Sequence, residues 1–264
     1  MNPILFAVLV VAGIGLIVGI VLAVASAVMA VPKDEKAEAI LEALPGANCG
    51  ACGFSGCSGY AKALADGSAK PGLCSPGGEE TAKAVATILG TKAEKSIKRT
   101  AVVHCSGSLQ HTENKMNYQG ISSCAAAVQL GGGPGKCAYG CIGLGDCKAA
   151  CEYDAITVCN GLAAVNPDKC KACTMCVSAC PKKLISILPV KKQAQVLCSS
   201  CDKGAQAKAA CSTGCIGCMR CVKACEFGAI KVENFHAVVD PSLCTGCMKC
   251  VESCKQGCIV EAFS

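Results

Sequence analysis

The chain has 264 residues, of which 27 are cysteine, and its formal charge of +6 counts every cysteine as neutral. Cysteines that bind a metal are thiolates, so this charge does not indicate an anionic partner, and no Lys/Arg run interleaved with aromatic residues suggests nucleic-acid binding. Because the number of cysteines is odd, they cannot all pair into disulfides within the chain. The chain has only five Phe, four Tyr and no Trp, so its small domains lack the large side chains that usually stabilise a core. We expect metal ligation to supply part of their folding free energy.

The N-terminal segment 4–31 contains no charged residue over 28 positions. About 20 apolar residues cross the hydrocarbon core, so we expect a transmembrane anchor within residues 1–32. A cleaved signal peptide is the alternative, because small alanines lie near the end of the segment, but no basic region precedes it. Lys33 and Lys36 follow the segment. They predict a single-pass protein of the cell membrane whose remaining domains are cytoplasmic, where reducing conditions keep thiols free to act as ligands.

Residues 33–95 are expected to form a small, mainly helical domain. Periodic apolar residues predict a short helix before Pro45, another over 58–65, and a helix with a linker over 79–98. Glycines accompany the first three of four cysteines, where backbone would wrap around a cluster. The expected [4Fe-4S] ligands are Cys49, Cys52, Cys57 and Cys74. A structural zinc site is the alternative. The motif N-C-G-x-C-G-x-x-G-C with a distant cysteine resembles the iron-sulfur domain of Rnf B subunits and some corrinoid enzymes.

The C-terminal part contains an internal repeat with an offset of 74 residues. Nine cysteines have a cysteine partner at this offset: Cys124, Cys137, Cys141, Cys147, Cys151, Cys170, Cys173, Cys176 and Cys180. After a connecting segment at 96–120, the sequence therefore predicts two ferredoxin-like repeats, at 121–194 and 195–264.

Runs of C-x2-C-x2-C-x3-C within the repeats are of the kind found in bacterial two-cluster ferredoxins, in which the fourth cysteine of each run binds the other cluster. Three regular sets result. They are Cys151 with Cys170, Cys173 and Cys176; Cys215, Cys218 and Cys221 with Cys254; and Cys225 with Cys244, Cys247 and Cys250. A zinc or disulfide interpretation does not explain two complete interleaved runs.

One set is irregular, because Leu144 stands where the second repeat has Cys218. We expect Cys137 to complete the set, since Gly140 allows a tight turn back toward its other members. The expected ligands are Cys137, Cys141, Cys147 and Cys180. A three-iron cluster or an empty site are the alternatives.

Further cysteines lie outside these sets. The candidates for an additional cluster are Cys105, Cys124, Cys198 and Cys211, with buried or free thiols as the alternative. Cys159, Cys201 and Cys258 have no repeat partner and are expected to remain unligated, with Cys201 as an alternative member of the additional set.

The order of apolar span, glycine-rich module and duplicated ferredoxin region resembles the clostridial-type B subunit of the Rnf ferredoxin:NAD oxidoreductase complex over essentially the whole chain. The resemblance implies an α+β fold with at least five, and up to six, [4Fe-4S] clusters. It implies that electrons from soluble ferredoxin pass to membrane-embedded and flavin-bearing subunits of a complex that reduces NAD and moves Na+ or H+.

No glycine-rich phosphate fingerprint and no arrangement of nucleophile and general base is found in the sequence, so no self-contained catalytic site is expected. The alternatives are an electron-donating component of another membrane-associated redox or corrinoid enzyme, and a structural metal-binding scaffold.

Overall fold

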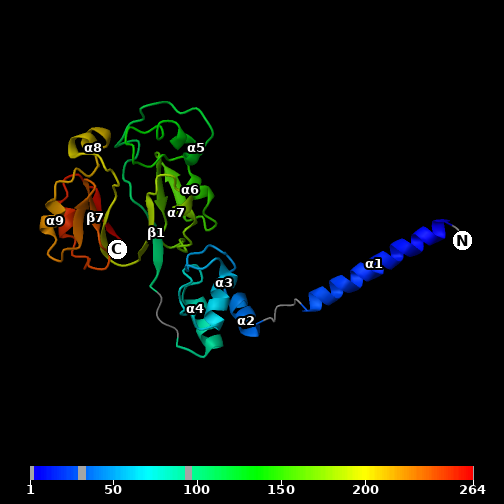
Figure 1. Ribbon diagram of the computed structural model, residues 1–264. Coiled ribbons are helices and arrows are strands. Elements are labelled where there is room, and N and C mark those ends of the chain that lie inside the picture. Colours follow the sequence, from blue (N-terminus) through cyan, green and yellow to red (C-terminus); the bar gives the residue numbers. More distant parts are fainter. Residues whose placement is uncertain (1–2, 29–33, 93–96, 264) are drawn as a thin grey trace.

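The computed structural model describes residues 3–28, 34–92 and 97–263. Its first element, α1 (Pro3–Val28), is one continuous helix that stands apart from the other elements in Figure 1. The window Leu9–Ser26 has a mean hydropathy of 2.7 and no buried residue, so by length and composition this helix can cross a membrane. The expected span at 4–31 agrees with α1, and positions 29–31 lie outside the described residues.

Three helices form the N-terminal module: α2 (Glu35–Ala43), α3 (Cys57–Ala65) and α4 (Gly78–Leu89). The Asp34 carboxylate accepts hydrogen bonds from the backbone N–H groups of Lys36 and Ala37, so it caps α2. Ile40, Tyr60 and Val85 meet in the buried core between the helices. All three helices lie where the apolar periodicity predicts them.

Two further units, each built from short helices and strand pairs, follow. We call residues 99–189 the first half and residues 193–262 the second half. The first half contains β1 (Arg99–Val103), α5 (Cys124–Gln129), α6 (Asp146–Ala149), β2 (Ile156–Cys159), β3 (Leu162–Val165), α7 (Met175–Ala179) and β4 (Ile185–Pro189). The second half contains β5 (Gln193–Val196), α8 (Gly204–Ala210), α9 (Arg220–Ala224), β6 (Ile230–Glu233), β7 (His236–Val239), α10 (Lys249–Ser253) and β8 (Ile259–Ala262).

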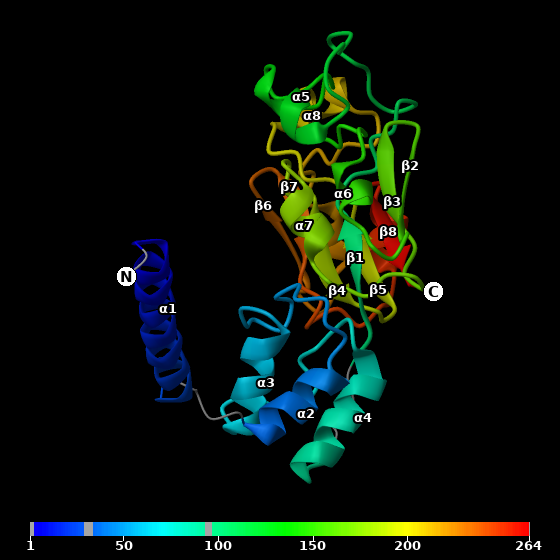
Figure 2. The same cartoon turned by 90° about the vertical axis from the view of Figure 1, so that its right-hand side faces the viewer.

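Each half has the same strand pairing. In the first half β1 pairs with β4 and β2 with β3; in the second half β5 pairs with β8 and β6 with β7, and every pair is antiparallel. The two halves lie beside one another, with the N-terminal module below the β1–β4 sheet (Figures 1 and 2).

The segment 96–120, expected to be a connection, contains β1, whose Val103 is in register with Ile185 of β4. It is therefore part of the first half's sheet. The second sheet begins at Gln193, two residues before the expected start of the second repeat at 195. Both differences arise because the first strand of each half, β1 or β5, lies before the first repeated cysteine of that half.

Cysteine occupies much of each core. The buried cluster of the second half contains Cys215, Cys221, Cys250 and Cys258 beside Ile230 and Ile259. The first half has Cys147 and Cys176 at comparable positions. Aliphatic and cysteine side chains together thus replace the large aromatic residues that the composition lacks.

Candidate iron-sulfur cluster sites

The four cysteines of the N-terminal module come together around the loop before α3. Burial raises the pKa of the Cys74 thiol, and the neighbouring thiols of Cys57, Cys49 and Cys52 raise it further. The Cys57 N–H donates to Asn48 Oδ1 at 2.8 Å. We call this set, Cys49, Cys52, Cys57 and Cys74, the N-terminal site.

In both halves, the turns that carry the cysteine runs share one backbone geometry. Between the second and third positions of the runs, left-handed residues precede the short helices: Gly145 (φ 88°), Thr174 (φ 67°), Met219 (φ 59°) and Met248 (φ 62°). The run that contains Leu144 in place of a cysteine keeps this turn. The backbone conformation of this run is therefore preserved, although Leu144 offers no thiol.

The three regular sets are each brought together. In the first, which we call site II, burial, followed by the charges of Cys170, Cys173 and, across the fold, Cys151, raises the pKa of Cys176 to about 12. Cys221 interacts with Cys215, Cys218 and Cys254 in the same way, and Cys250 with Cys244, Cys225 and Cys247. We call these sets sites III and IV. Each fourth cysteine comes from the other run, as the interleaved pattern predicts.

The irregular set is completed differently from the expectation. Cys141, Cys147 and Cys180 line one pocket, and the fourth thiol in it belongs to Cys124, not to Cys137. Burial first, then the thiols of Cys141, Cys124 and Cys180, raise the pKa of Cys147 to about 11. We call this set, Cys124, Cys141, Cys147 and Cys180, site I.

Asp146 holds Cys124 in this position. Its carboxylate accepts hydrogen bonds from the backbone N–H groups of Cys124 (2.8 Å) and Ala125 (2.9 Å) and from the Ser123 hydroxyl (3.0 Å). Partial burial opposes the ionised form of Asp146, but these hydrogen bonds outweigh it and lower the pKa of the carboxyl. The residue next to Cys147 thereby fixes the start of α5, and with it the thiol of Cys124.

Cys137 instead lines a pocket between the two halves. The four thiols there are Cys105 and Cys137 from the first half and Cys198 and Cys211 from the second. We call this set the bridging site. It shares three members with the candidate set for an additional cluster, and Cys137 stands in place of Cys124.

Backbone hydrogen bonds show that the bridging site is symmetric. Cys141 N–H donates to Cys105 Sγ (3.4 Å), and Cys215 N–H, 74 positions later, donates to Cys198 Sγ (3.2 Å). Cys105 is therefore the structural counterpart of Cys198, although the sequence offset pairs Cys198 with Cys124. The two intervals span 36 and 17 residues, so the first half carries 19 additional residues, and Cys124 lies in that longer stretch.

Six sets account for all but three cysteines. Cys159 is exposed at the end of β2, and Cys201 donates to the Ser199 carbonyl at 3.8 Å. Cys258 is buried and lines the pocket of site III. His104, beside Cys105, has both ring nitrogens in hydrogen bonds, to the Val196 carbonyl and the Ser186 hydroxyl.

Comparisons with known proteins identify iron-sulfur domains at the same places. The sequence matches the FeS family, which describes an Fe-S cluster, over residues 44–76; a 4Fe-4S binding domain over 163–186; and a 4Fe-4S dicluster domain over 214–259.

Curated relatives extend the similarity to almost the whole chain. The B subunit of the Na(+)-translocating ferredoxin:NAD(+) oxidoreductase complex of Acetobacterium woodii is 43% identical over 91% of this chain and 72% of the relative. The chain belongs to the family of Rnf B subunits. Other members are the B subunit of the proton-translocating ferredoxin:NAD(+) oxidoreductase complex of Clostridium ljungdahlii (41% identity; 92% of this chain, 86% of the relative) and that of the ion-translocating oxidoreductase complex of Methanosarcina acetivorans (38%; 88% of each).

The thiol sets of this Rnf family member offer four sulfurs each, the number that a four-iron cluster needs, and the matched family models describe 4Fe-4S binding. Burial raises the pKa of Cys105 and Cys221 to about 11, and neighbouring thiols add to this effect. These sulfurs would become thiolates beside the positive charge of a bound cluster's iron.

Proposed function

We propose that this chain is the electron-relay subunit of a membrane-bound, ion-translocating ferredoxin:NAD+ oxidoreductase and has no self-contained catalytic site. Clusters bound at its cysteine sets would supply one-electron transfer. The observation that carries the proposal is that the described residues gather 24 cysteines into six sets of four, with interactions that link neighbouring sets.

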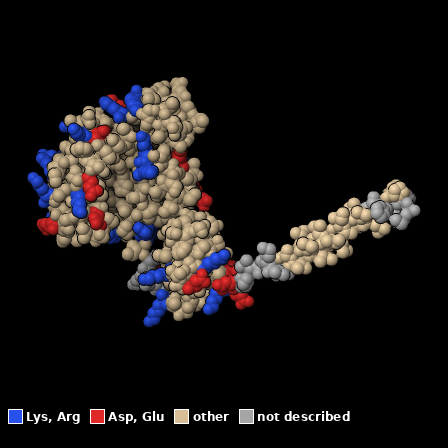
Figure 3. Space-filling view, in the orientation of Figure 1, with Lys and Arg blue, Asp and Glu red and all other residues tan. Residues whose placement is uncertain are grey.

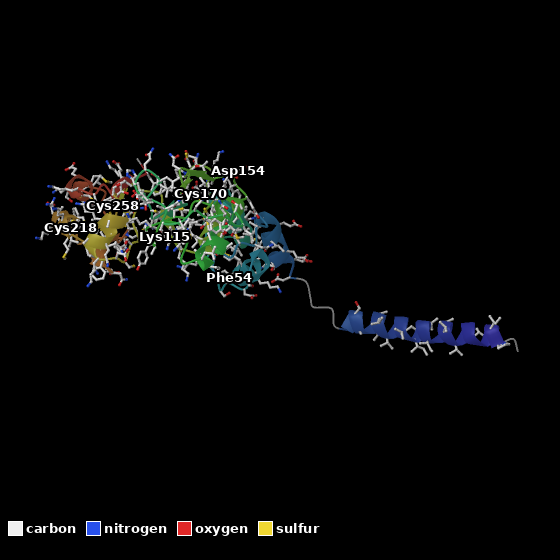
Figure 4. All side chains as sticks on the ribbon, turned by 90° about the horizontal axis from the view of Figure 1, so that it is seen from above. Phe54, Lys115, Asp154, Cys170, Cys218 and Cys258 are labelled. Atoms are coloured by element: carbon white, nitrogen blue, oxygen red, sulfur yellow. The ribbon has the colours of Figure 1, made fainter. Side chains whose placement is uncertain are left out.

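The order of the sites follows from contacts between their thiols. Cys173 of site II interacts electrostatically with Cys49 of the N-terminal site, and Cys176 of site II with Cys147 of site I. The N–H···S hydrogen bonds of Cys141 and Cys215 then join site I to the bridging site and the bridging site to site III. Sites III and IV share the interleaved runs. Figure 4 shows the corresponding succession of Phe54, Cys170, Cys258 and Cys218 along the molecule.

The second half is the proposed entry for electrons. Cys218 of site III and Cys247 of site IV are exposed, so a soluble donor can approach their clusters closely. Met219, beside Cys218, and Phe235 are also half exposed, which suits a transient protein contact. Two relatives belong by name to ferredoxin:NAD(+) oxidoreductase complexes, so we assign reduced soluble ferredoxin as the donor.

The N-terminal module is the proposed exit. It follows α1, the helix long enough to span a membrane, and membrane-embedded and flavin-bearing subunits are the proposed acceptors. Tyr153 lines the pocket of site II. Burial raises the pKa of its phenol, and the nearby charges of Cys173, Glu152, Cys49 and Cys74 add to this effect.

We propose that all domains after α1 face the cytoplasm. The support is the pair of lysines, Lys33 and Lys36, that follows the span. The backbone N–H of Lys36 donates to Asp34 at the start of α2, and Lys33 lies outside the described residues. In intact cells, a membrane-impermeant thiol reagent should leave the exposed Cys159 unlabelled. Labelling from outside equal to that in lysed cells would reverse the topology.

The decisive experiment is the iron and acid-labile sulfide content of the anaerobically purified full chain. Six four-iron clusters predict about 24 irons per chain, and five predict about 20. Cys211→Ala should lower the iron content by about four, and Cys159→Ala should not change it. A colourless protein with no paramagnetic signal on reduction would contradict the electron-relay function. A brown protein with about 20 irons that is unaffected by Cys211→Ala would remove only the bridging cluster.

A further inference from the structure

Site III contains a fifth thiol. Cys258 is only 1% exposed, lines the same pocket as the four ligand cysteines of this site, and places its Sγ 3.6 Å from Cys254 Sγ. The sequence gives it no repeat partner, and neither the family models nor the names of the relatives assign it a role.

The equivalent position in the first half is occupied by Leu184. Leu184 and Cys258 are 74 residues apart, and each accepts the same backbone hydrogen bond at 2.7 Å, from His104 N–H and from Leu197 N–H respectively. Leu184 is buried to a similar degree, at 2% exposure, and lines the pocket of site I. The two sites therefore differ at this position by the exchange of an apolar side chain for a thiol.

Cys254 rather than Cys258 occupies the ligand position. Cys254 caps the C-terminal end of α10 in the extended conformation, as Cys225 caps α9 and Cys180 caps α7. Cys258 lies four residues further on, directly before β8, where the first half has Leu184. Its side chain is therefore additional to the four cysteines of the regular pattern.

A thiol in this place can donate a hydrogen bond to a ligand sulfur. Cys258 Sγ lies 3.6 Å from Cys254 Sγ, within the range of a hydrogen bond between two sulfur atoms. Cys258 is the fifth thiol in a pocket whose four other thiols form the expected ligand set, so it can keep its proton and donate it to Cys254. A donor pointed at a ligand thiolate withdraws negative charge from it and favours the more negative, reduced state of a cluster.

We propose that Cys258 is a positioning residue that hydrogen-bonds the thiolate ligands of site III and raises the reduction potential of its cluster above that of site I. The proposal rests on the proposed function only in requiring that site III holds a cluster. Its consequence is a second difference between sites I and III, in addition to the exchange of a regular ligand for Cys124 in site I.

The test is a redox titration of the full chain followed by low-temperature paramagnetic spectra. Cys218→Ala, which removes an exposed ligand, identifies the signal of site III by its loss. Cys258→Leu, which installs the side chain of the first half, should shift the midpoint of that signal to a more negative potential with the iron content unchanged. The smaller Cys258→Ala should give a shift of the same sign and guards against overpacking by Leu.

The reciprocal variant provides the matched control. Leu184→Cys should shift the site I signal to a more positive potential, and Cys159→Ala, which removes an exposed thiol elsewhere, should shift neither signal. An unchanged site III midpoint in both Cys258 variants would overturn the proposal. Loss of about four irons in both would also overturn it, because Cys258 would then be a ligand. A wild-type chain without a site III signal would instead count against the proposed function itself.

Discussion

At the scale of single residues, site I has lost one cysteine of the regular run and has gained another from a different part of the chain. Leu144 removes the thiol that the second half has at Cys218, while Cys124 enters the same pocket from α5. The cradle around Leu144 retains its left-handed glycines, Gly143 (φ 77°) and Gly145 (φ 88°). The backbone can therefore still present a ligand at position 144.

This arrangement predicts a rescue. Cys124→Ala should lower the iron content by about four or convert one cluster to a three-iron form, because three thiols remain. Adding Leu144→Cys should restore the four-iron signal, since the new thiol stands where a regular run has its second ligand. Iron analysis and low-temperature paramagnetic spectra measure both effects. Failure of the double variant to recover the lost signal, with Cys137→Ala abolishing the same paramagnetic signal as Cys124→Ala and leaving the one lost in Cys211→Ala, would restore Cys137 as the ligand.

Asp146 has a predicted effect on stability as well as on the site. Asp146→Ala removes the acceptor for two backbone N–H groups and one hydroxyl at the start of α5. Losing such a cap costs about 1 kcal/mol, which lowers the melting temperature by about 2–4 °C in a protein of this size. The control is Asp168→Ala, whose carboxylate makes an exposed ion pair with Lys98 and should have little effect. Equal changes in both variants would show that the cap is not specific.

The sequence groups the cysteines where a run repeats the spacing of bacterial two-cluster ferredoxins, and it fails where the run is irregular. Cys176, Cys221 and Cys250 each interact electrostatically with the cysteines of their expected sets, whose role as cluster ligands stays a prediction. Nearness in sequence selected Cys137 for the irregular set, but 19 extra residues between Cys105 and Cys141 bring Cys124 to site I and Cys137 to the bridging site. The signal that could have found this is the unequal interval, since Cys105, like Cys159, Cys201 and Cys258, has no partner at the 74-residue offset.

At the scale of elements, β1 contains a polar side chain that its surroundings do not satisfy. Thr100 is fully buried, and its Oγ1 has no hydrogen-bond partner among the residues that the structure describes. An unpaired buried hydroxyl costs about 1–3 kcal/mol. Thr100→Val should therefore raise the melting temperature, by about 2–4 °C for each kcal/mol gained. Thr157→Val, on the exposed side of β2, is the matched control and should change it little. A lower melting temperature for Thr100→Val would show that the hydroxyl has a partner after all.

Helices were easier to predict than sheet partners. The amphipathic pattern before Pro45 and the apolar run of α1 are local properties, and both helices lie where that pattern puts them. The pairing of β1 with β4 joins Arg99 to Pro189, across a separation that periodicity does not encode. The five residues of β1 precede the first repeated cysteine, so the sequence alone does not distinguish this strand from a connection.

At the scale of the whole molecule, charge lies close to the proposed entry. Figure 3 shows Lys and Arg side chains, with Asp and Glu among them, on the side of the molecule that carries α9. Arg220 and Lys223 of this helix follow the exposed Cys218 in the sequence. A complementary donor surface is therefore acidic. The N-terminal module lies at the opposite end of the row of sites and is separate from this surface.

The double charge reversal Arg220→Glu and Lys223→Glu should weaken binding of reduced ferredoxin about tenfold at low ionic strength and reduce its salt dependence. Titration of the full chain with ferredoxin at two salt concentrations measures both quantities. Lys83→Glu on α4 is the control and should leave the affinity unchanged. Similar affinities for the double variant and the wild type would place the donor elsewhere.

The bridging site also imposes an order on how the protein is made. Its ligands Cys105 and Cys137 leave the ribosome well before Cys198 and Cys211, because synthesis proceeds from the N-terminus at about 5–20 residues per second. A nascent chain can receive iron at the N-terminal site and at sites I and II while the second half is still being translated. The proposed bridging cluster can be inserted only after both halves exist and have met. Its presence therefore shows that both halves have been made, and a chain stalled or truncated before Cys211 would lack the bridging site together with sites III and IV.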